Sequence, residues 1–306
     1  MSKIDGILLL DKPAGITSNA ALQTVKHYYH AKKAGHTGSL DPIATGMLPI
    51  CFGEATKFTQ FLLTADKKYR VTAKLGIITA SGDTDSPVLE KREVRDITTE
   101  KVSKVLELFS GTILQLPSMY SALKYKGKPL YKLARQGIEV ERTPREVKIY
   151  AIKLLDLTED SLTLEVFCSK GTYIRTLLAD IGESLGCGAH VVALRRLEVG
   201  PFQEQQMVAM PIVEDFASKN AINSLHSLLL PIESMFNSWH EVQLTDDMVY
   251  YLQQGNPLLI PNVPASGLVK LKSKTQEFLG VGEVLADGRV APKRLMQKRV
   301  QFLTKE

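Results

Sequence analysis

The sequence GHTGSLDPIATGMLP occupies residues 35–49 of this 306-residue chain. Its three glycines and two prolines argue against a long helix or a regular central strand, and they predict a shaped loop. The loop gathers a histidine (His36), an aspartate (Asp41) and three hydroxyl side chains. Because a proline disfavours helical backbone at the preceding residue, Asp41 is expected to be extended and to present its carboxylate outward. From these residues alone, a connecting loop in which Asp41 merely caps a turn is also an open interpretation.

Alternating apolar residues predict strands on both sides of this loop. A short apolar run at residues 7–10 precedes it, and apolar and polar residues alternate at 69–75 and again at 162–168. These strands interleave irregularly with helical segments, without the steady strand–helix repeat of a doubly wound sheet. The pattern therefore predicts an α+β fold.

Apolar residues at helical spacing predict three helices. The first is expected to have Ser18 as its N-cap, and the second spans residues 102–109. The third spans residues 174–185, with Thr172 as its expected N-cap and Gly186 at its C-terminal cap.

Composition excludes several classes of protein. Hydrophobic residues make up 44% and charged residues 23%, as in ordinary globular proteins. The apolar runs are much shorter than the roughly 18 residues of a membrane span, and the N-terminus lacks the features of a signal peptide. Three cysteines without a CxxC pair argue against a disulfide scaffold or a structural zinc site. A cytoplasmic protein without membrane association is expected.

Charge is unevenly distributed along the chain. Residues 1–75 hold ten lysines and arginines against five acidic residues, whereas residues 201–244 hold one against five. Residues 245–306 are basic again, with nine against six. Clustered positive charge suggests a polyanionic partner, although a solvated surface explains the same pattern.

The end of the chain is expected to be a small β-rich module with one basic face. Strand-like runs at 268–271 and 278–285 precede Asp287-Gly288, a tight-turn signal that predicts a hairpin. We expect a main domain at 1–245 and a second domain at 246–306. The basic residues of the tail are Arg289, Lys293, Arg294, Lys298, Arg299 and Lys305.

Five segments together resemble one family. The stretch at 35–49 is similar to the active-site motif of the bacterial tRNA pseudouridine-55 synthases, the TruB family, with Ser39 where threonine or alanine is frequent. Four further segments agree in order and spacing: LLLDKPAGITS, DKKYRV, PSMYSALKYKGKPLYKLARQG and CSKGTYIRTLLADIGESLGCGAHVVALRRLEVG. The resemblance implies an enzyme that isomerises uridine 55 in the T-arm loop of tRNA, without cofactor or metal. It also implies a catalytic domain with a mixed, largely antiparallel sheet.

The resemblance implies chemical roles for three residues. Asp41 is implied as the catalytic carboxylate and Arg175 as its ion partner, since a buried carboxylate stays ionised more readily beside a cation. Tyr69 is implied as the active-site tyrosine that stacks on the flipped uracil and helps to remove its C5 proton. Whether Asp41 attacks the sugar, attacks the base or removes a sugar proton is left open.

Other residues are implied to shape the site. Tyr173 and Leu194 correspond to positions that line the uracil pocket. His36 is implied to stand where the flipped base was and to hold the RNA open. Lys12 and Pro13 match an early motif that supports the active-site loop.

Two regions are expected to bind RNA. Residues 117–148 carry eight lysines and arginines interleaved with three tyrosines, which suits contacts to phosphates and stacking on bases. Residues 246–306 resemble a PUA domain and are expected to touch the acceptor arm of tRNA. No obligatory protein partner is expected, and the protein is expected to be a monomer.

Three alternative functions stay open. The chain could be a non-catalytic RNA-binding or RNA-folding protein, or a related synthase that acts at another RNA site. A hydrolase would need a second carboxylate to activate water, which the 35–49 loop does not offer. The Asp83-Thr84-Asp85 sequence is interpreted as a polar turn, because two carboxylates alone make a poor metal site.

Overall fold

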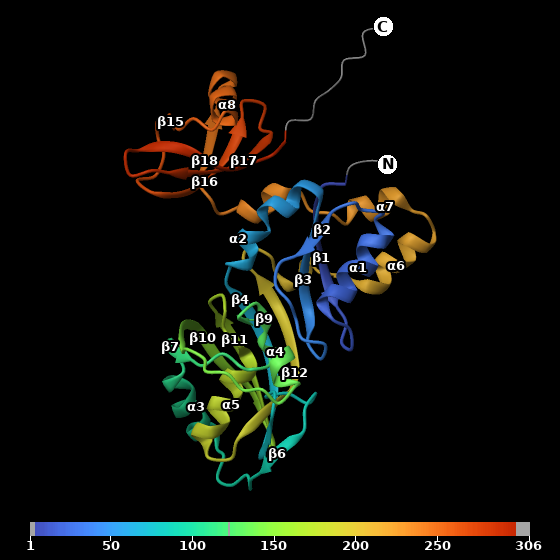
Figure 1. Ribbon diagram of the computed structural model, residues 1–306, viewed down its shortest axis with the longest axis vertical. Coiled ribbons are helices and arrows are strands. Elements are labelled where there is room, and N and C mark those ends of the chain that lie inside the picture. Colours follow the sequence, from blue (N-terminus) through green and yellow to red (C-terminus); the bar gives the residue numbers. More distant parts are fainter. Residues whose placement is uncertain (1–3, 122, 298–306) are drawn as a thin grey trace.

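The computed structural model describes residues 4–121 and 123–297 and contains a large sheet and a small sheet, each with helices beside it (Figure 1). The predicted α+β class is confirmed. Lys298, Arg299 and Lys305 of the expected basic tail lie outside the described residues. Among the described residues, no helix has both the length and the apolar character needed to cross a bilayer.

The large sheet is mixed and mostly antiparallel, as expected. Its strands are β1 (Gly6–Lys12), β2 (Ala34–His36), β3 (Thr45–Phe52), β4 (Lys67–Leu75), β7 (Gly111–Gln115), β10 (Arg145–Leu157), β11 (Ser161–Cys168), β12 (Ala189–Val199) and β13 (Val208–Ala209). Within the described residues the order is β13-β1-β3-β12-β4-β11-β10-β7, with β2 beside β3. The β1–β13 and β3–β12 pairs are parallel, and the remaining pairs are antiparallel.

Six α-helices of the described residues lie beside the large sheet. They are α1 (Ser18–Tyr28), α2 (Thr59–Leu63), α3 (Thr99–Leu108), α5 (Ile174–Leu185), α6 (Met210–Ser218) and α7 (Ile222–Ser227), with short 3-10 helices at Gly53–Phe58, Glu204–Gln206 and Ile232–Phe236. α3 and α5 share one apolar core with β4, β10, β11 and β12. α1, α6 and α7 share another core with β1 and β3. The strands β5 (Ile77–Thr79) and β6 (Val88–Lys91) form a separate hairpin.

The strands and helices predicted from periodicity are present, but two predicted caps are wrong. Thr17, not Ser18, caps α1 by accepting a hydrogen bond from the backbone N–H of Ala20. Thr172 does not cap α5, because its hydroxyl donates to the carbonyl of Ser169 at 2.9 Å instead. The C-terminal cap of α5 is confirmed.

Part of the predicted loop at 35–49 is strand, which corrects the sequence-based expectation. β2 ends at His36, and β3 begins at Thr45 and continues through Pro49 between neighbouring strands. The carbonyl of Pro49 accepts from Thr37 on the side away from β1. On that side β12 pairs only as far as Gly46 and β2 pairs from Ile50 onward, so the missing N–H of proline falls where the ladder is interrupted.

The small sheet contains the predicted hairpin. Its elements are β14 (Glu241–Leu244), α8 (Asp246–Gln253), β15 (Leu258–Leu259), β16 (Gly267–Ser273), β17 (Phe278–Val284) and β18 (Arg289–Leu295). In the described residues the strand order is β14-β16-β17-β18-β15. β17 and β18 are antiparallel and are joined through Asp287-Gly288.

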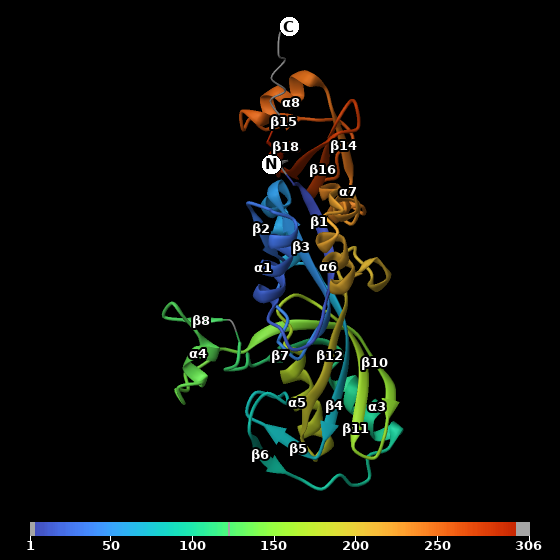
Figure 2. The ribbon, with the colours of Figure 1, turned by 90° about the vertical axis from the view of Figure 1, so that its right-hand side faces the viewer.

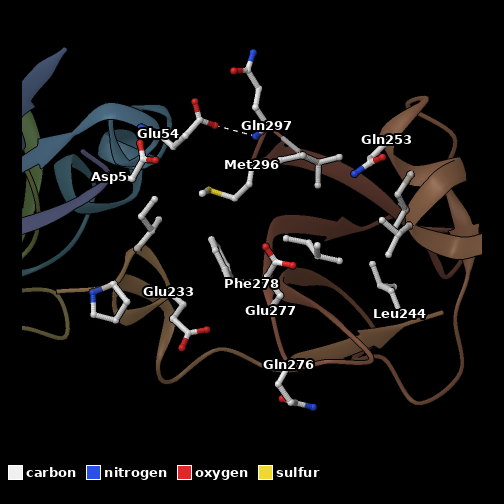
Figure 3. Close-up of a pocket in the computed structure, with 16 residues that line it drawn as sticks. Asp5, Glu54, Glu233, Leu244, Gln253, Gln276, Glu277, Phe278, Met296 and Gln297 are labelled. Carbon is white, nitrogen blue, oxygen red and sulfur yellow. Dashed lines mark hydrogen bonds between the residues drawn. The ribbon is translucent and has the colours of Figure 1, made fainter. Parts of the chain in front are cut away.

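An aromatic cluster joins the two sheets. Phe58 and Phe236, beside the large sheet, lie 5.7 Å and 5.6 Å by ring centroid from Phe278 of the small sheet. Beside this contact is a cleft of about 700 Å³ (Figure 3). Carboxylates line the cleft and would repel phosphates, so it is not a suitable RNA site. They belong to Asp5, Glu54, Glu233 and Glu277.

A basic arm projects from the large sheet. We call residues 117–121 and 123–144 the arm; it contains β8 (Lys124–Tyr125), β9 (Lys128–Pro129) and α4 (Leu130–Ala134). Figure 2 shows β8 and α4 standing away from the rest of the molecule. A small apolar cluster of Met119, Leu130 and Leu133 holds the arm together.

Candidate active site

The loop that carries Asp41 is clamped on both sides of that residue. The hydroxyl of Ser18 accepts from the N–H of Leu40 at 2.7 Å and donates to its carbonyl at 3.1 Å. The fully buried Lys12 donates to the carbonyl of Pro42 at 3.4 Å and to two carbonyls of its own turn at 2.8 Å. Burial lowers the pKa of Lys12 to about 8. These contacts give Lys12 the loop-supporting position that the resemblance implied.

Arg175 joins two carboxylates at the start of α5. Its Nε lies 3.0 Å from Oδ2 of Asp41, and its Nη1 lies 2.9 Å from Oδ2 of Asp83. The side chain of Asp41 is 38% exposed, whereas that of Asp83 is 4% exposed. Arg175 also donates from Nη2 to the carbonyl of Tyr120 in the arm, at 2.9 Å. The guanidinium is therefore held from the interior while one carboxylate stays accessible.

Asp83 was not foreseen as part of this site. The predicted polar turn is present, since the carboxylate of Asp83 accepts from the hydroxyl of Ser81 and from the N–H of Asp85. The same carboxylate also pairs with Arg175, which lies 92 residues away. A polar Ser-Gly-Asp-Thr-Asp run carries no sequence signal for such a buried long-range contact.

The surroundings of Asp41 act on its pKa in opposite directions. Burial raises the pKa most strongly, and the nearby negative charges of Asp83 and Asp85 raise it further. Arg175 and, to a smaller degree, Lys12 lower it. The net direction is upward, so the paired arginine limits a shift that burial would otherwise make larger.

Tyr69 and Leu194 lie on adjacent strands near this pair. Tyr69 in β4 is directly opposite Arg196 in β12, and Val71 is opposite Leu194. Leu194 is 7% exposed, and Tyr69 packs beside the same apolar core. Burial raises the pKa of the Tyr69 phenol, the positive charge of Arg196 lowers it, and the charge of Asp41 adds a smaller upward contribution. The pKa of Tyr69 therefore depends on the charges of both Arg196 and Asp41.

Tyr173 and His36 are the remaining predicted site residues. Tyr173 immediately precedes α5, and its N–H and carbonyl both bond the buried side-chain amide of Gln115, at 2.7 and 3.1 Å. Burial, together with Arg196, lowers the pKa of His36. Its buried Nδ1 has no hydrogen-bond partner among the described residues. No cluster of three or more potential metal-ligating residues occurs in the described part of the chain.

Family comparisons account for almost the whole chain. Residues 26–174 match the family described as "TruB family pseudouridylate synthase (N terminal domain)". The chain belongs to the TruB family. Residues 175–237 match "tRNA pseudouridylate synthase B C-terminal domain", and residues 241–296 match "Pseudouridine synthase II TruB, C-terminal".

Named relatives and solved structures agree with this membership. The chain is 57% identical over 296 residues to the "tRNA pseudouridine synthase B" of Coxiella burnetii (strain Dugway 5J108-111), covering 97% of this chain and 96% of that protein. The protein of the same name from Nitrosococcus oceani is 54% identical, with 96% and 95% covered. The structure titled "Crystal Structure of a Cbf5-Nop10-Gar1 Complex" matches with a TM-score of 0.74 and 27% identity, over 95% of this chain and 84% of that one.

Proposed function

We propose that this TruB-family enzyme converts uridine 55 in the T-arm loop of tRNA to pseudouridine. The observation that carries the proposal is the ion pair between Asp41 and Arg175. It places an accessible carboxylate beside a cation that a second, buried ion pair with Asp83 holds in position. Relatives at 57% and 54% identity are named tRNA pseudouridine synthase B, which supports tRNA as the substrate.

The proposed reaction requires mainly a carboxylate that is positioned beside the target nucleoside. The bond between N1 of uracil and C1′ of ribose breaks, the base turns, and C5 bonds to C1′; C5 then loses its hydrogen as a proton, and N1 takes up a proton from solvent. Asp41 acts in its ionised form, and Arg175 favours that form. Tyr69 stacks on the base and assists loss of the C5 proton. We propose no cofactor and no metal for this isomerisation.

The other site residues are proposed to hold the flipped nucleotide. Leu194 and Tyr173 line the uracil pocket, and His36 occupies the space that the base leaves. Flipping costs about a few kcal/mol, which contacts between the protein and the RNA must offset. A largely neutral His36, favoured by its lowered pKa, can enter a stack of bases with a smaller desolvation cost than a charged one.

We propose that RNA contacts extend along the molecule. The arm grips the T-arm, and the small sheet touches the acceptor arm as a PUA-like domain. β14 pairs with β16, and the family matches divide between residues 237 and 241, so both observations favour a domain boundary a few residues before 246. The enzyme is proposed to act as a monomer in the cytoplasm, where its substrate is made.

A tritium-release assay tests the reaction. With tRNA labelled at C5 of uracil, the wild-type protein should release about one tritium per tRNA, because C5 loses hydrogen only when a carbon–carbon bond forms there. Asp41→Asn should release none while binding tRNA within about tenfold of wild type. Asp85→Asn, which changes an exposed carboxylate nearby, is the matched control and should stay active. Free uracil as product, or tight binding without release by wild type, would contradict the proposal; mapping of the product then tests position 55.

A further inference from the structure

Arg196 is a buried residue that bonds the loop carrying Asp41, and no described hydrogen bond or ion pair joins it to Asp41 or Arg175. It lies in β12, opposite Tyr69 on β4 and opposite Gly46 on β3. The residue is 2% exposed. Because directly opposed residues on neighbouring strands place their side chains on one face, Arg196 and Tyr69 are side-chain neighbours.

The guanidinium of Arg196 joins the two ends of the active-site loop. Its Nε donates to the carbonyl of Met47 at 2.7 Å, and its Nη2 donates to the carbonyl of Gly38 at 3.1 Å. Asp41 lies between these two anchor points in the chain. Arg196 is also the cross-strand partner of Tyr69, and its positive charge lowers the pKa of the Tyr69 phenol, which burial raises. One rigid group thus bonds both ends of the loop that carries the carboxylate, and it belongs to the residue directly opposite Tyr69.

The charge of Arg196 is unusual for so buried a group. Among the described residues, no carboxylate lies within ion-pair distance of it, and its side-chain hydrogen bonds are donated to carbonyl oxygens. The neighbouring Arg195 shows the ordinary arrangement, with a 31% exposed side chain paired with Asp11 and Glu204 at 2.8 and 2.9 Å. An unpaired buried cation costs stability, so its retention calls for a function that the fold alone does not supply.

We propose that Arg196 is a positioning residue for pseudouridine formation, which holds the Asp41 loop and the Tyr69 phenol in one fixed arrangement. This inference rests on the proposed function. It differs from the role of Arg175, which contacts the carboxylate itself. Lysine cannot replace Arg196, because a single ammonium is not a planar fork that donates to the carbonyls of Met47 and Gly38 together.

Backbone packing makes the arrangement rigid. Gly46 has φ +95°, and a Cβ at this position would lie 2.3 Å from the carbonyl oxygen of Arg196. β3 and β12 therefore approach closely at the residue whose side chain crosses to the loop. Small displacements of reacting groups cost about 100-fold in rate, so loss of these contacts should act on the chemical step.

The test compares Arg196→Lys and Arg196→Met with Arg195→Lys as the matched control from the adjacent, solvent-reaching position. Single-turnover rates of pseudouridine formation are measured at saturating tRNA, tRNA Kd is measured separately, and thermal unfolding defines the folded fraction. We expect both Arg196 variants to lose about 100-fold or more in rate with Kd within about threefold, and Arg195→Lys to keep its rate within about threefold. If one Arg196 variant does not fold, the other carries the comparison.

A second measurement separates positioning from general structural support. In a Tyr69→Phe background, the loss caused by Arg196→Lys should be at least about tenfold smaller than in wild type, because part of its effect passes through the phenol. Equal losses in the two backgrounds, unchanged rates at saturating tRNA, or a defect confined to Kd would overturn the inference. A wild-type protein that forms no pseudouridine would instead overturn the proposed function, and the inference would fall with it.

Discussion

At the scale of single residues, the charge of Arg175 is shared between a buried carboxylate and an accessible one. Arg175 and Asp83 are both almost inaccessible, with side chains 9% and 4% exposed. A buried pair of this kind contributes little net stability when whole, but removing one partner leaves a charge that water cannot reach. Asp83 therefore maintains the orientation of Arg175 toward Asp41 in addition to satisfying its charge.

Asp83→Asn should affect both stability and catalysis. Because the amide removes the buried counter-charge and leaves Arg175 paired only with the partly exposed Asp41, we expect a loss of about 3 kcal/mol in the free energy of unfolding. The single-turnover rate should fall at least about tenfold, since Arg175 is then free to shift away from Asp41. Urea unfolding and rate measurements check this, with the exposed Asp85→Asn as control. A stable variant with the wild-type rate would show that Asp83 does not position Arg175.

The raised pKa of Asp41 predicts the acid limb of the pH–rate profile. A raised pKa keeps the carboxyl neutral at a pH where an ordinary aspartate, with a pKa of 3.8, is ionised. The single-turnover rate should therefore fall as pH decreases through a midpoint above 3.8. Arg175→Gln should move that midpoint to still higher pH, because Arg175 lowers the pKa of Asp41. A midpoint that moves downward in this variant would contradict the assignment.

At the scale of helices and strands, the sequence predicted those features that depend on residues close together in the chain. Val71, Ala73 and Leu75 alternate in the sequence and are buried in β4. α5 ends where Gly186 adopts φ +90°, a conformation that glycine reaches without strain. The strand β3 was missed because Pro49 is tolerated only where the ladder beside it is interrupted, and that interruption depends on how far β2 and β12 extend. Tertiary contacts of this kind produce no periodic pattern in the sequence.

In the active site too, the contacts between distant residues could not be predicted from local sequence patterns. Periodicity indicated neither the pairing of Arg175 with Asp41, 134 residues apart, nor its pairing with Asp83. The first was expected only from the family resemblance, and the second was not expected at all. The predicted cap at Ser18 failed for a related reason, because its hydroxyl is used to hold Leu40 in the active-site loop.

Two glycines with left-handed backbone should respond differently to alanine. At Gly186 nothing lies within 4 Å of an added Cβ, so Gly186→Ala should cost only the backbone strain, about 1 kcal/mol, and leave the rate unchanged. At Gly46 the same substitution forces β3 away from β12, and we expect about 3 kcal/mol or more together with at least a tenfold lower rate. Thermal unfolding and single-turnover kinetics compare the two. Equal costs would argue against the close approach of the strands.

At the scale of the whole molecule, the arm carries exposed positive charge that is available for RNA. Arg289 and Lys293 of the small sheet pair with Asp287 and Glu283 at 2.7 and 2.6 Å. The arm residues Lys124, Lys126 and Lys128 are exposed. Among the described ion pairs, none includes these three lysines. The arm therefore has the unpaired charge that phosphate contacts require.

Replacing Lys124, Lys126 and Lys128 together with glutamine should weaken tRNA binding at least about tenfold. The plot of log affinity against log salt should become less steep by about two to three, since each phosphate contact contributes about 0.7 to 0.9. The rate at saturating tRNA should stay near wild type, because the carbonyl of Tyr120 that holds Arg175 is unaffected. Lys219→Gln, at the exposed C-cap of α6 and paired with Asp215, is the control. An unchanged salt slope would place the phosphate contacts elsewhere, with the small sheet as the next surface to test.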